Sequence, residues 1–428
     1  MNYQETMEYL DSLNKLGSVP GLDTIRELLC RLGNPQDEVQ FIHIAGTNGK
    51  GSVSAFISSI LIESGYRVGR YNSPAVLSPL EIIKINTEDI SEERFAEIIS
   101  GIRVKCEEMV KDGLFHPTRF EIETAAGFVF FAEENCDYAV VECGMGGKLD
   151  ATNVISTTIC SVITPISVDH TSFLGNSIAE ITQHKAGIIK KNIPIVSAAQ
   201  NDEAEEVIRS CAINNDSEYY FVRNSIDNIR YTGSGIVFDY KDFTDVEIAL
   251  LGIYQPYNAA TAIECVLRLA EQGINIDKAS IYKGLLNAKW FGRFTRLGTL
   301  PDFVVDGAHN PDGAYMLSKC LEKYYPEGGL TFITGVFADK DYKGILDCCI
   351  PYASQVITIQ TPQNSRALSA KALAEFIKNH YDVCVHTYND IENAVRFAID
   401  NTSSDRAVIA FGSLSHLANI KEAYMKLI

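Results

Sequence analysis

The sequence is poor in several features that mark large classes of protein. Its 428 residues hold one tryptophan and 11 cysteines without a C-x-x-C pair. No apolar run approaches the roughly 18 residues that a membrane helix needs. The first residues lack the basic and apolar stretches of a signal peptide, and low-complexity tracts, heptad arrays and short repeats are missing too. We therefore expect a soluble cytoplasmic protein whose cysteines are mostly buried free thiols.

Basic residues are also in short supply. The chain has 37 Lys and Arg against 55 Asp and Glu, which gives a net charge of −18. An acidic protein is a poor general binder of nucleic acid or anionic membrane, so we expect neither as a partner. A local basic pocket for phosphate is compatible with this charge. Hydrophobic residues make up 46%, enough for a large core divided over two to three domains.

Short apolar segments that end in glycine alternate with segments of helical period in the first part of the chain. Residues 39–45 predict a strand, and apolar residues at helical spacing predict a helix over 52–64. Further buried strands are expected at 137–144, 158–166 and 193–198. This alternation indicates an α/β fold with a parallel sheet, of the P-loop ATPase-like kind.

The last third of the chain has its own rhythm. Strand-like runs begin near Phe303, Thr331, Gln355, Val383 and Ala407, with gaps that each fit one crossover helix. We expect a smaller Rossmann-like α/β domain here, with the predicted domains spanning 1–297 and 298–428. A dehydrogenase is disfavoured, because no G-x-G-x-x-G segment follows a strand.

A glycine-rich segment with a lysine lies between the first predicted strand and its helix. Glycines let backbone N–H groups approach phosphate oxygens, and the amino end of the helix adds a favourable dipole. Lys50 can reach the β- and γ-phosphates of a nucleotide, and the hydroxyl of Ser52 or Thr47 can contact phosphate or Mg²⁺. The spacing differs from the general G-x-x-x-x-G-K-[ST] loop, since only two residues separate Gly46 from Gly49. The predicted nucleotide-binding residues are Gly46, Thr47, Asn48, Gly49, Lys50, Gly51 and Ser52.

The segment G-T-N-G-K-G-S at 46–52 resembles the nucleotide loop of the Mur ligase family. It is most similar to that of the folylpolyglutamate and dihydrofolate synthases. Further motifs of these enzymes follow in the same order, and together they are far more specific than any one alone. They lie at Tyr71–Pro74, Glu81–Asn86, Glu142–Asn153, Asp169–Gly175, Lys185–Ile188, Gln255–Ala260, Trp290–Phe294, Asp306–Pro311, Asp339–Asp341 and Arg366–Ala367.

The resemblance implies a reaction. Members of the family phosphorylate a substrate carboxylate with ATP, and the amine of a second substrate then attacks the acyl phosphate. A folate or dihydropteroate carboxylate is the implied acceptor and L-glutamate the implied amine. We therefore expect a bifunctional folylpolyglutamate synthase/dihydrofolate synthase that acts as a monomer with ATP and two Mg²⁺ ions. The lack of a G-x-S-x-G segment agrees with a reaction that needs no protein nucleophile.

The candidate catalytic residues are Lys50, Glu142, His170 and Lys185. Glu142 follows the buried run 138–141, where a carboxylate is costly to bury without a cation. The resemblance makes Glu142, His170 and the Ser73 hydroxyl ligands of Mg²⁺. It also matches Lys185 to a lysine that CO₂ carbamylates in the family. That modification requires a neutral amine, and so a pKa lowered by burial or by nearby positive charge.

Nucleotide contacts in the second half of the chain are implied for Asn258, Arg293, Asp306 and His309. The Asn258 amide can pair with the adenine edge, and Arg293 can neutralise phosphate charge in a bidentate manner. Asp306 could accept hydrogen bonds from ribose hydroxyls, and His309 could contact phosphate or ribose. Two domains would then share one site and close over it, which would exclude water from the acyl phosphate.

Two alternatives to this function remain open. Ala75 and Val76 stand where the family usually has His-Leu, in a loop that helps to hold the pterin, so the same chemistry could serve a non-folate carboxylate. A peptidoglycan precursor is disfavoured as acceptor, because the 45 residues before Gly46 are too few for the extra domain of such enzymes. A nucleotide-binding regulator without catalysis is disfavoured by the retention of all four candidate catalytic residues.

Overall fold

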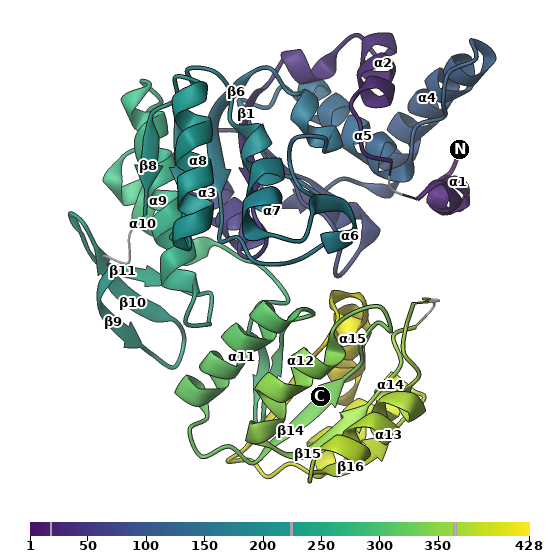
Figure 1. Ribbon diagram of the computed structural model, residues 1–428, viewed down its shortest axis with the longest axis vertical. Coiled ribbons are helices and arrows are strands. Elements are labelled where there is room, and N and C mark those ends of the chain that lie inside the picture. Colours follow the sequence, from purple (N-terminus) through teal and green to yellow (C-terminus); the bar gives the residue numbers. More distant parts are fainter. Residues whose placement is uncertain (18, 223–225, 363, 365) are drawn as a thin grey trace.

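The computed structural model describes residues 1–428 apart from 18, 223–225, 363 and 365. Two α/β bodies, each built on its own sheet, lie one above the other along the long axis of the molecule (Figure 1). The N-terminal body carries a mostly parallel sheet, and the C-terminal body is a separate α/β domain. Both parts of the expected fold class are therefore confirmed.

The sheet of the N-terminal body has the strand order β4-β3-β2-β5-β1-β6-β7-β8. Its strands are β1 (Gln40–Ala45), β2 (Val68–Tyr71), β3 (Ile83–Ile85), β4 (Glu88–Asp89), β5 (Tyr138–Glu142), β6 (Thr158–Ile163), β7 (Ile195–Ser197) and β8 (Tyr219–Phe221). The six strands from β2 to β8 in this order run parallel. At one edge β3 pairs antiparallel with β2, and β4 pairs antiparallel with β3. The buried strands predicted from apolar runs are all confirmed.

Helices cover both faces of this sheet. They are α1 (Tyr3–Ser12), α2 (Asp23–Arg31), α3 (Lys50–Glu63), α4 (Glu92–Lys111), α5 (Arg119–Glu133), α6 (Thr171–Leu174), α7 (Ile178–Lys185), α8 (Asp202–Asn214), α9 (Gln255–Glu271) and α10 (Lys278–Asn287). Phe41 of β1 packs with the helices α1, α2, α4 and α5, whereas its neighbour Ile42 packs with α3, α9 and α10. Successive strand side chains point to opposite faces, so one buried strand contributes to two cores.

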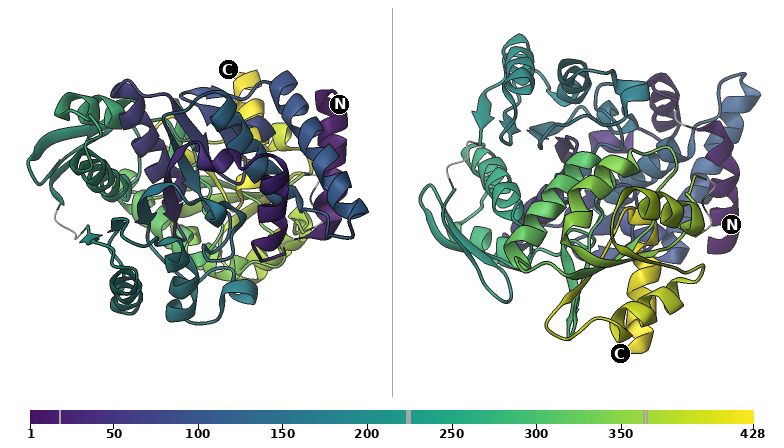
Figure 2. Two further views of the ribbon diagram at one scale, coloured as in Figure 1. Left: turned by 90° about the horizontal axis from the view of Figure 1, so that it is seen from above. Right: turned by 60° about the horizontal axis from the view of Figure 1, so that its bottom comes forward.

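A small antiparallel sheet projects from the side of the N-terminal body (Figures 1 and 2). It consists of β9 (Ile226–Tyr231), β10 (Ile236–Tyr240) and β11 (Phe243–Ile248). Our sequence analysis did not predict these strands. Their side chains alternate between buried and exposed positions, as in Ile236–Tyr240, instead of forming the continuous apolar runs of the main sheet.

The C-terminal sheet has the order β12-β13-β17-β14-β15-β16. Its elements are β12 (Thr295–Thr299), β13 (Asp302–Val305), α11 (Pro311–Tyr324), β14 (Leu330–Thr334), α12 (Tyr342–Cys349), β15 (Ala353–Thr358), α13 (Ala370–His380), β16 (Cys384–Thr387), α14 (Ile391–Asp400), β17 (Ala407–Phe411) and α15 (Leu417–Leu427). All five strands expected in this region are present, and they run parallel.

The domain boundary expected from the sequence remains a prediction. The predicted boundary between 297 and 298 lies inside β12, which pairs with β13 of the C-terminal sheet. We propose that the second domain begins just before Thr295, because strand pairing joins β12 to that sheet.

All 11 cysteines are free thiols, and most are buried. Within the described residues, no helix is long and apolar enough to span a membrane.

Candidate functional site

The loop between β1 and α3 has a backbone that only glycine adopts readily. Gly46 has a φ of 148° and Gly49 one of 90°. A Cβ on Gly46 would lie 1.9 Å from the Oγ1 of Thr164, so the loop packs directly on the strand end beside it. The Thr47 side chain donates to the carbonyl of Ser167 over 3.1 Å and accepts from its N–H over 3.1 Å. The loop is thus held in place and leaves the amino end of α3 available for an anion.

A buried carboxylate lies beside the lysine of this loop. Glu142 ends β5, and its Oε1 is 3.6 Å from the Nζ of Lys50. Its Oε2 accepts a hydrogen bond of 2.7 Å from the amide of Asn72, which follows β2. Burial raises the pKa of Glu142, while Lys50, Asn72 and Arg293 act to lower it. The two strand ends therefore place a buried carboxylate next to the expected phosphate position.

A second lysine approaches the loop from the other side. Lys185 at the end of α7 is buried and donates a hydrogen bond of 2.7 Å to the carbonyl of Gly46. Burial, and after it the charge of Lys50, lowers the pKa of Lys185 to about 7. A substantial share of this amine is therefore neutral near pH 7, as the sequence-based hypothesis of a carbamylated lysine requires.

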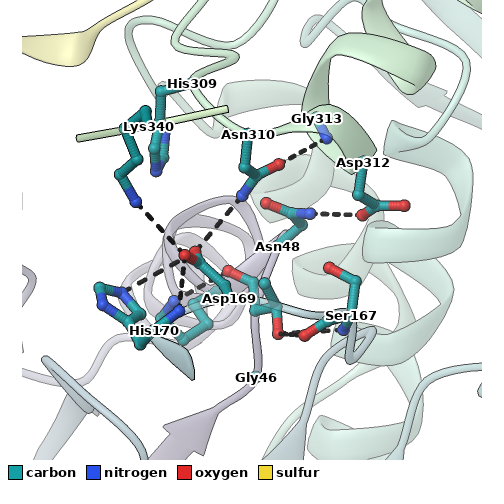
Figure 3. Close-up of polar contacts among 12 residues, drawn as sticks. Gly46, Asn48, Ser167, Asp169, His170, His309, Asn310, Asp312, Gly313 and Lys340 are labelled. Carbon is teal, nitrogen blue, oxygen red and sulfur yellow. Dashed lines mark hydrogen bonds and ion pairs between the residues drawn. The ribbon is translucent and has the colours of Figure 1, made fainter. Parts of the chain in front are cut away.

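Polar residues of the two bodies meet at Asp169 (Figure 3). Its carboxylate is 3.3 Å from the Nζ of Lys340 and accepts a hydrogen bond of 3.4 Å from the Asn310 amide. Burial acts to raise the pKa of Asp169, but the charges of His170 and Lys340 outweigh it and lower the pKa to about 2. The adjacent His170 caps the short helix α6 in a left-handed conformation.

A second contact between the bodies lies at the phosphate loop itself. The Asn48 amide donates a hydrogen bond of 2.6 Å to Asp312, in the first turn of α11 (Figure 3). Asn310 caps the same helix through a 2.7 Å hydrogen bond from the N–H of Gly313. The amino end of α11 therefore joins the loop, although Asp312 places a negative charge there.

The four residues implied in nucleotide binding gather around one small cavity. Asn258, Arg293, Asp306 and His309 line a space of about 190 Å³, together with Gly49 and Ser52 of the phosphate loop. Asp306 is buried, and its oxygens already accept hydrogen bonds from the N–H groups of Phe294 and Ala308. Burial lowers the pKa of His309 to about 4, so its imidazole is neutral at pH 7. This grouping agrees with the expectation that both bodies contribute to one site.

Two further cavities adjoin the first. A largely apolar one of about 590 Å³ is bordered by Ser73 and His170, and by Phe120 and Glu123 of α5. A more polar one of about 740 Å³ lies between the bodies and is lined by His170, Asp312 and Lys340 among others. His170 borders both, and Asp312 borders the polar space and the nucleotide cavity. The polar space therefore shares lining residues with each of the other two cavities, and the phosphate loop lines the smallest one.

The donor set at this region fits a hard divalent cation in part. The described residues contain no group of three or more His, Cys, Asp or Glu side chains that could hold a metal ion. Mg²⁺ needs no such group, since it keeps several waters and commonly takes one or two carboxylates plus substrate phosphates. Glu142 supplies a buried carboxylate, which accepts a hydrogen bond from Asn72. The next residue, Ser73, adds a hydroxyl. His170 is a less usual ligand for this ion.

Sequence reasoning located most of these residues but missed several of their partners. Asn72, Asp169, Asn310 and Lys340 lie inside recognised motifs, yet no role was predicted for them. Asp312 lies one residue beyond such a motif. Their contacts join strand ends or domains that are far apart in sequence, so spacing alone could not reveal them.

Comparisons with known proteins agree with the geometry. Residues 44–266 match the Mur ligase middle domain, and residues 292–414 match the glutamate ligase domain of Mur ligases. The chain is 32% identical to the dihydrofolate synthase/folylpolyglutamate synthase of Bacillus subtilis, over 98% of both chains. It is 36% identical to the folylpolyglutamate synthase of Lacticaseibacillus casei, over 86% of this chain and 87% of the other.

Solved structures lead to the same group of enzymes. The folylpolyglutamate synthase of Mycobacterium tuberculosis, complexed with ADP and AMPPCP, is similar with a TM-score of 0.88 and 29% identity, over 100% of this chain and 99% of that one. The corresponding enzyme of Thermotoga maritima has a TM-score of 0.85 and 33% identity, over 100% and 97% of the two chains.

Proposed function

The chain belongs to the Mur ligase family, among the folylpolyglutamate and dihydrofolate synthases, and from this premise we propose that it joins L-glutamate to a folate or dihydropteroate carboxylate with hydrolysis of ATP. It is an ATP-dependent acid–amino-acid ligase. The observation that carries the assignment is a set of three cavities with shared lining residues, the smallest of which is lined by the glycine-rich loop. Their number equals that of the substrates of such a reaction.

The reaction proceeds in two transfers. An oxygen of the acceptor carboxylate attacks the γ-phosphorus of ATP, and ADP leaves. The amine of L-glutamate then attacks the acyl carbon, inorganic phosphate leaves, and the amine loses a proton. Both steps bring anions together, so catalysis consists mainly of positioning and charge neutralisation.

The phosphate loop and its lysine neutralise the nucleotide. Backbone N–H groups of residues 46–52 and the amino end of α3 would face the β- and γ-phosphates, and Lys50 would supply a positive charge. Glu142, Ser73 and His170 would hold the divalent ion that ATP requires. When bound, that ion offsets charge that develops on the transferred phosphoryl group. The use of two Mg²⁺ ions stays part of the proposal.

Arg293 and Asn258 serve the nucleotide from the far side of the loop. Arg293 carries the only guanidinium that lines the small cavity, and Asn258 presents an amide beside Gly49. Asp306 fixes the backbone of Phe294 and Ala308, which gives the cavity its wall. Contacts of Asp306 and His309 with the ribose are part of the same proposal.

The larger apolar cavity suits the acceptor. Phe120 and Met145 offer flat and flexible apolar contacts for a conjugated ring, and Ser73 and His170 stand at its border with the catalytic region. Ala75 also lines this cavity, at a position where the family usually has a larger residue. This difference in the cavity wall could change which acceptor the enzyme prefers. L-glutamate would then occupy the polar space between the bodies, close to Lys340 and Arg366.

The test of the function is release of phosphate from ATP with Mg²⁺ and L-glutamate. Dihydropteroate, tetrahydrofolate and no acceptor are compared, with Glu142→Gln as an inactive control. Stimulation by both acceptors is the expected result and supports the bifunctional assignment. Stimulation by dihydropteroate alone restricts the enzyme to dihydrofolate synthesis. Stimulation by neither acceptor contradicts the folate assignment and favours a ligase for another carboxylate.

Carbamylation of Lys185 is proposed from its lowered pKa and its place beside the loop. The modification exchanges a buried cation for an anion, which would favour a neighbouring divalent ion. Incubation with ¹³C-bicarbonate is expected to give a carbamate signal by NMR in the wild-type protein. Lys185→Arg is the matched control, because its guanidinium stays charged. An identical signal in both proteins would place the carbamate elsewhere.

Monomeric state and cytoplasmic location complete the proposal. The first is checked by light scattering during size-exclusion chromatography with ATP present. The second is checked by fractionation of cells that express the protein.

A further inference from the structure

A groove on the N-terminal body, separate from the three cavities above, contains an unpaired arginine. One face of α3, the strands β2 and β3, and the segment after α10 form its walls, and its volume is about 750 Å³. Arg70 of β2 lines this groove, and its Nε is buried. Its guanidinium has no hydrogen bond or ion pair in the part of the chain that the structure describes.

The side chain of Arg70 is half-buried, and its guanidinium makes no ion pair with the nearest carboxylates of the described chain. Glu81 raises the pKa of Arg70 more than Glu142 does. Its carboxylate accepts hydrogen bonds from the backbone N–H groups of Val76 and Leu77. Glu142 belongs to Lys50 and Asn72, as described above. Burial lowers the pKa of Arg70 to about 10 although Glu81 and Glu142 act in the opposite direction. Arg70 therefore has two carboxylates near enough to act on its pKa but makes no direct ion pair with either.

A second cation lies on the neighbouring strand. Lys84 of β3 forms an ion pair with Asp89, and it lines the same groove as Arg70. Burial lowers the pKa of Lys84, and the charge of Arg70 adds to that effect. The groove also has acidic residues, but Glu63 already accepts a hydrogen bond of 2.8 Å from Asn287. Glu88 stands at the exposed edge strand β4.

Two neutral donors in the groove wall are also without partners. The indole Nε1 of Trp290 and the hydroxyl of Ser58 are buried and make no hydrogen bond in the described part of the chain. Both residues line the groove, and the Arg70 guanidinium lies 5.4 Å from the centre of the indole ring. Arg70, Ser58 and Trp290 thus bring three donor groups without a hydrogen-bond partner to the wall of one groove, and unpaired donors at a concave surface favour an acceptor-rich group.

We propose that this groove binds a small oxyanion, a carboxylate or a phosphate, with Arg70 as its main contact and Lys84 as the supporting charge. The planar guanidinium offers two parallel N–H groups that match either anion. L-glutamate and inorganic phosphate carry this chemistry, and both take part in the proposed reaction. The choice of these probes rests on the proposed function, whereas the site itself rests on the groove alone.

Trp290 makes the groove observable. It is the single tryptophan of the chain, so intrinsic fluorescence reports on this position. A Cβ on Gly51 would lie 2.2 Å from the indole ring, which shows that the ring packs directly on the first turn of α3. The anion site and the phosphate loop therefore share one side chain as a common wall.

The test is a fluorescence titration of the full-length protein with inorganic phosphate or with L-glutamate at constant ionic strength, with sodium chloride as the reference salt. We expect a saturable change with at least one probe, and the probe that acts identifies the source of the anion. Arg70→Gln should abolish the change. Arg70→Lys, which keeps the charge but not the fork, should weaken binding by about tenfold. Lys50→Ala should keep the response, because that lysine serves the nucleotide site and does not line the groove.

Each other result overturns the proposal. These results are no saturable change with either probe, an equal change with chloride, a response that survives in Arg70→Gln, or one that is lost in Lys50→Ala. Circular dichroism checks the fold of each variant. If Arg70→Gln does not fold, the affinity of Arg70→Lys tests the proposal in its place. Because the titration needs no turnover, a failure of the ligase assay does not affect it.

Discussion

Lys185 shows how one position can be set for chemistry at the cost of stability. Its amine is buried against the Gly46 carbonyl, close to the charge of Lys50. A buried cation beside another cation disfavours the protonated form, which is why its pKa falls to about 7 from an ordinary 10.5. The same burial places the amine next to the loop that we propose binds ATP.

Replacing this lysine is expected to stabilise the protein most at low pH. Between pH 7 and 10.5 the unfolded chain binds a proton that the folded chain has released, so wild-type stability gains from rising pH in this window. Below pH 7 the Lys185 amine is protonated in the folded chain as well, so the folded state carries the whole cost of this buried charge. Lys185→Met should therefore raise the free energy of unfolding by on the order of 2 kcal/mol below that pH, and by less above it. Urea denaturation on either side of the pKa measures this.

The control for that experiment is Lys191→Met, since Lys191 is 72% exposed and 3.8 Å from Asp216. Its effect should be small at every pH. A gain in Lys185→Met that does not depend on pH would contradict the argument from the lowered pKa.

The turn between β1 and α3 depends on glycine for its shape. Gly46 combines a φ of 148° with a side-chain position that Thr164 already occupies. The loop therefore follows the neighbouring strand end more closely than any other residue would allow. This close approach aligns the backbone N–H groups of the turn with the start of α3.

Gly46→Ala is expected to disrupt nucleotide binding and to lower stability. The added Cβ would meet the Thr164 hydroxyl at 1.9 Å, so the loop or β6 must shift. Overpacking of this kind costs about 1–3 kcal/mol. We expect a weaker affinity for ADP by calorimetry and a lower melting temperature. Gly101→Ala in α4 is the matched control, because nothing lies within 4 Å of its Cβ position and alanine favours a helix. Equal ADP affinity in both variants would contradict the role given to Gly46.

The two bodies of the molecule are joined across the site by a few polar contacts. Asp169 forms an ion pair with Lys340 and accepts a hydrogen bond from Asn310, both of the C-terminal body. Asn48 of the phosphate loop donates a hydrogen bond to Asp312. Polar contacts at the site suit domains that open to admit substrates and close for reaction. Because these contacts involve the loop and the residue next to His170, we propose that closure of the two bodies would also assemble the site.

Lys340→Met should make closure less favourable without unfolding either body. The lost ion pair with Asp169 is partly buried and contributes about 1 kcal/mol, so we expect turnover to fall several-fold. Steady-state phosphate release measures this. Lys343→Met on α12 is the control, because its partner Asp347 belongs to the same helix and no second body is involved. A similar loss of turnover in both variants would argue against a role for the interdomain pair.

Much of this molecule could be inferred from patterns that are local in the chain. Continuous apolar runs predicted the parallel strands, since a strand covered on both faces needs no polar side. The glycines and lysine at 46–50 indicated a phosphate loop, because backbone approach and positive charge are required within one short turn. The strands β9–β11 escaped notice because their half-exposed alternation is less distinctive.

The partners within the site could not be inferred in this way. Asn72 reaches Glu142 only because β2 lies beside β5 in the sheet, and Lys185 reaches Gly46 across 139 positions of the chain. The groove around Arg70 combines four separate segments, and the Asp169 contacts depend on how two domains meet. Local composition therefore determines which elements form and which chemistry they can carry. Strand order and domain contact determine which charges face one another, because those depend on packing between distant segments.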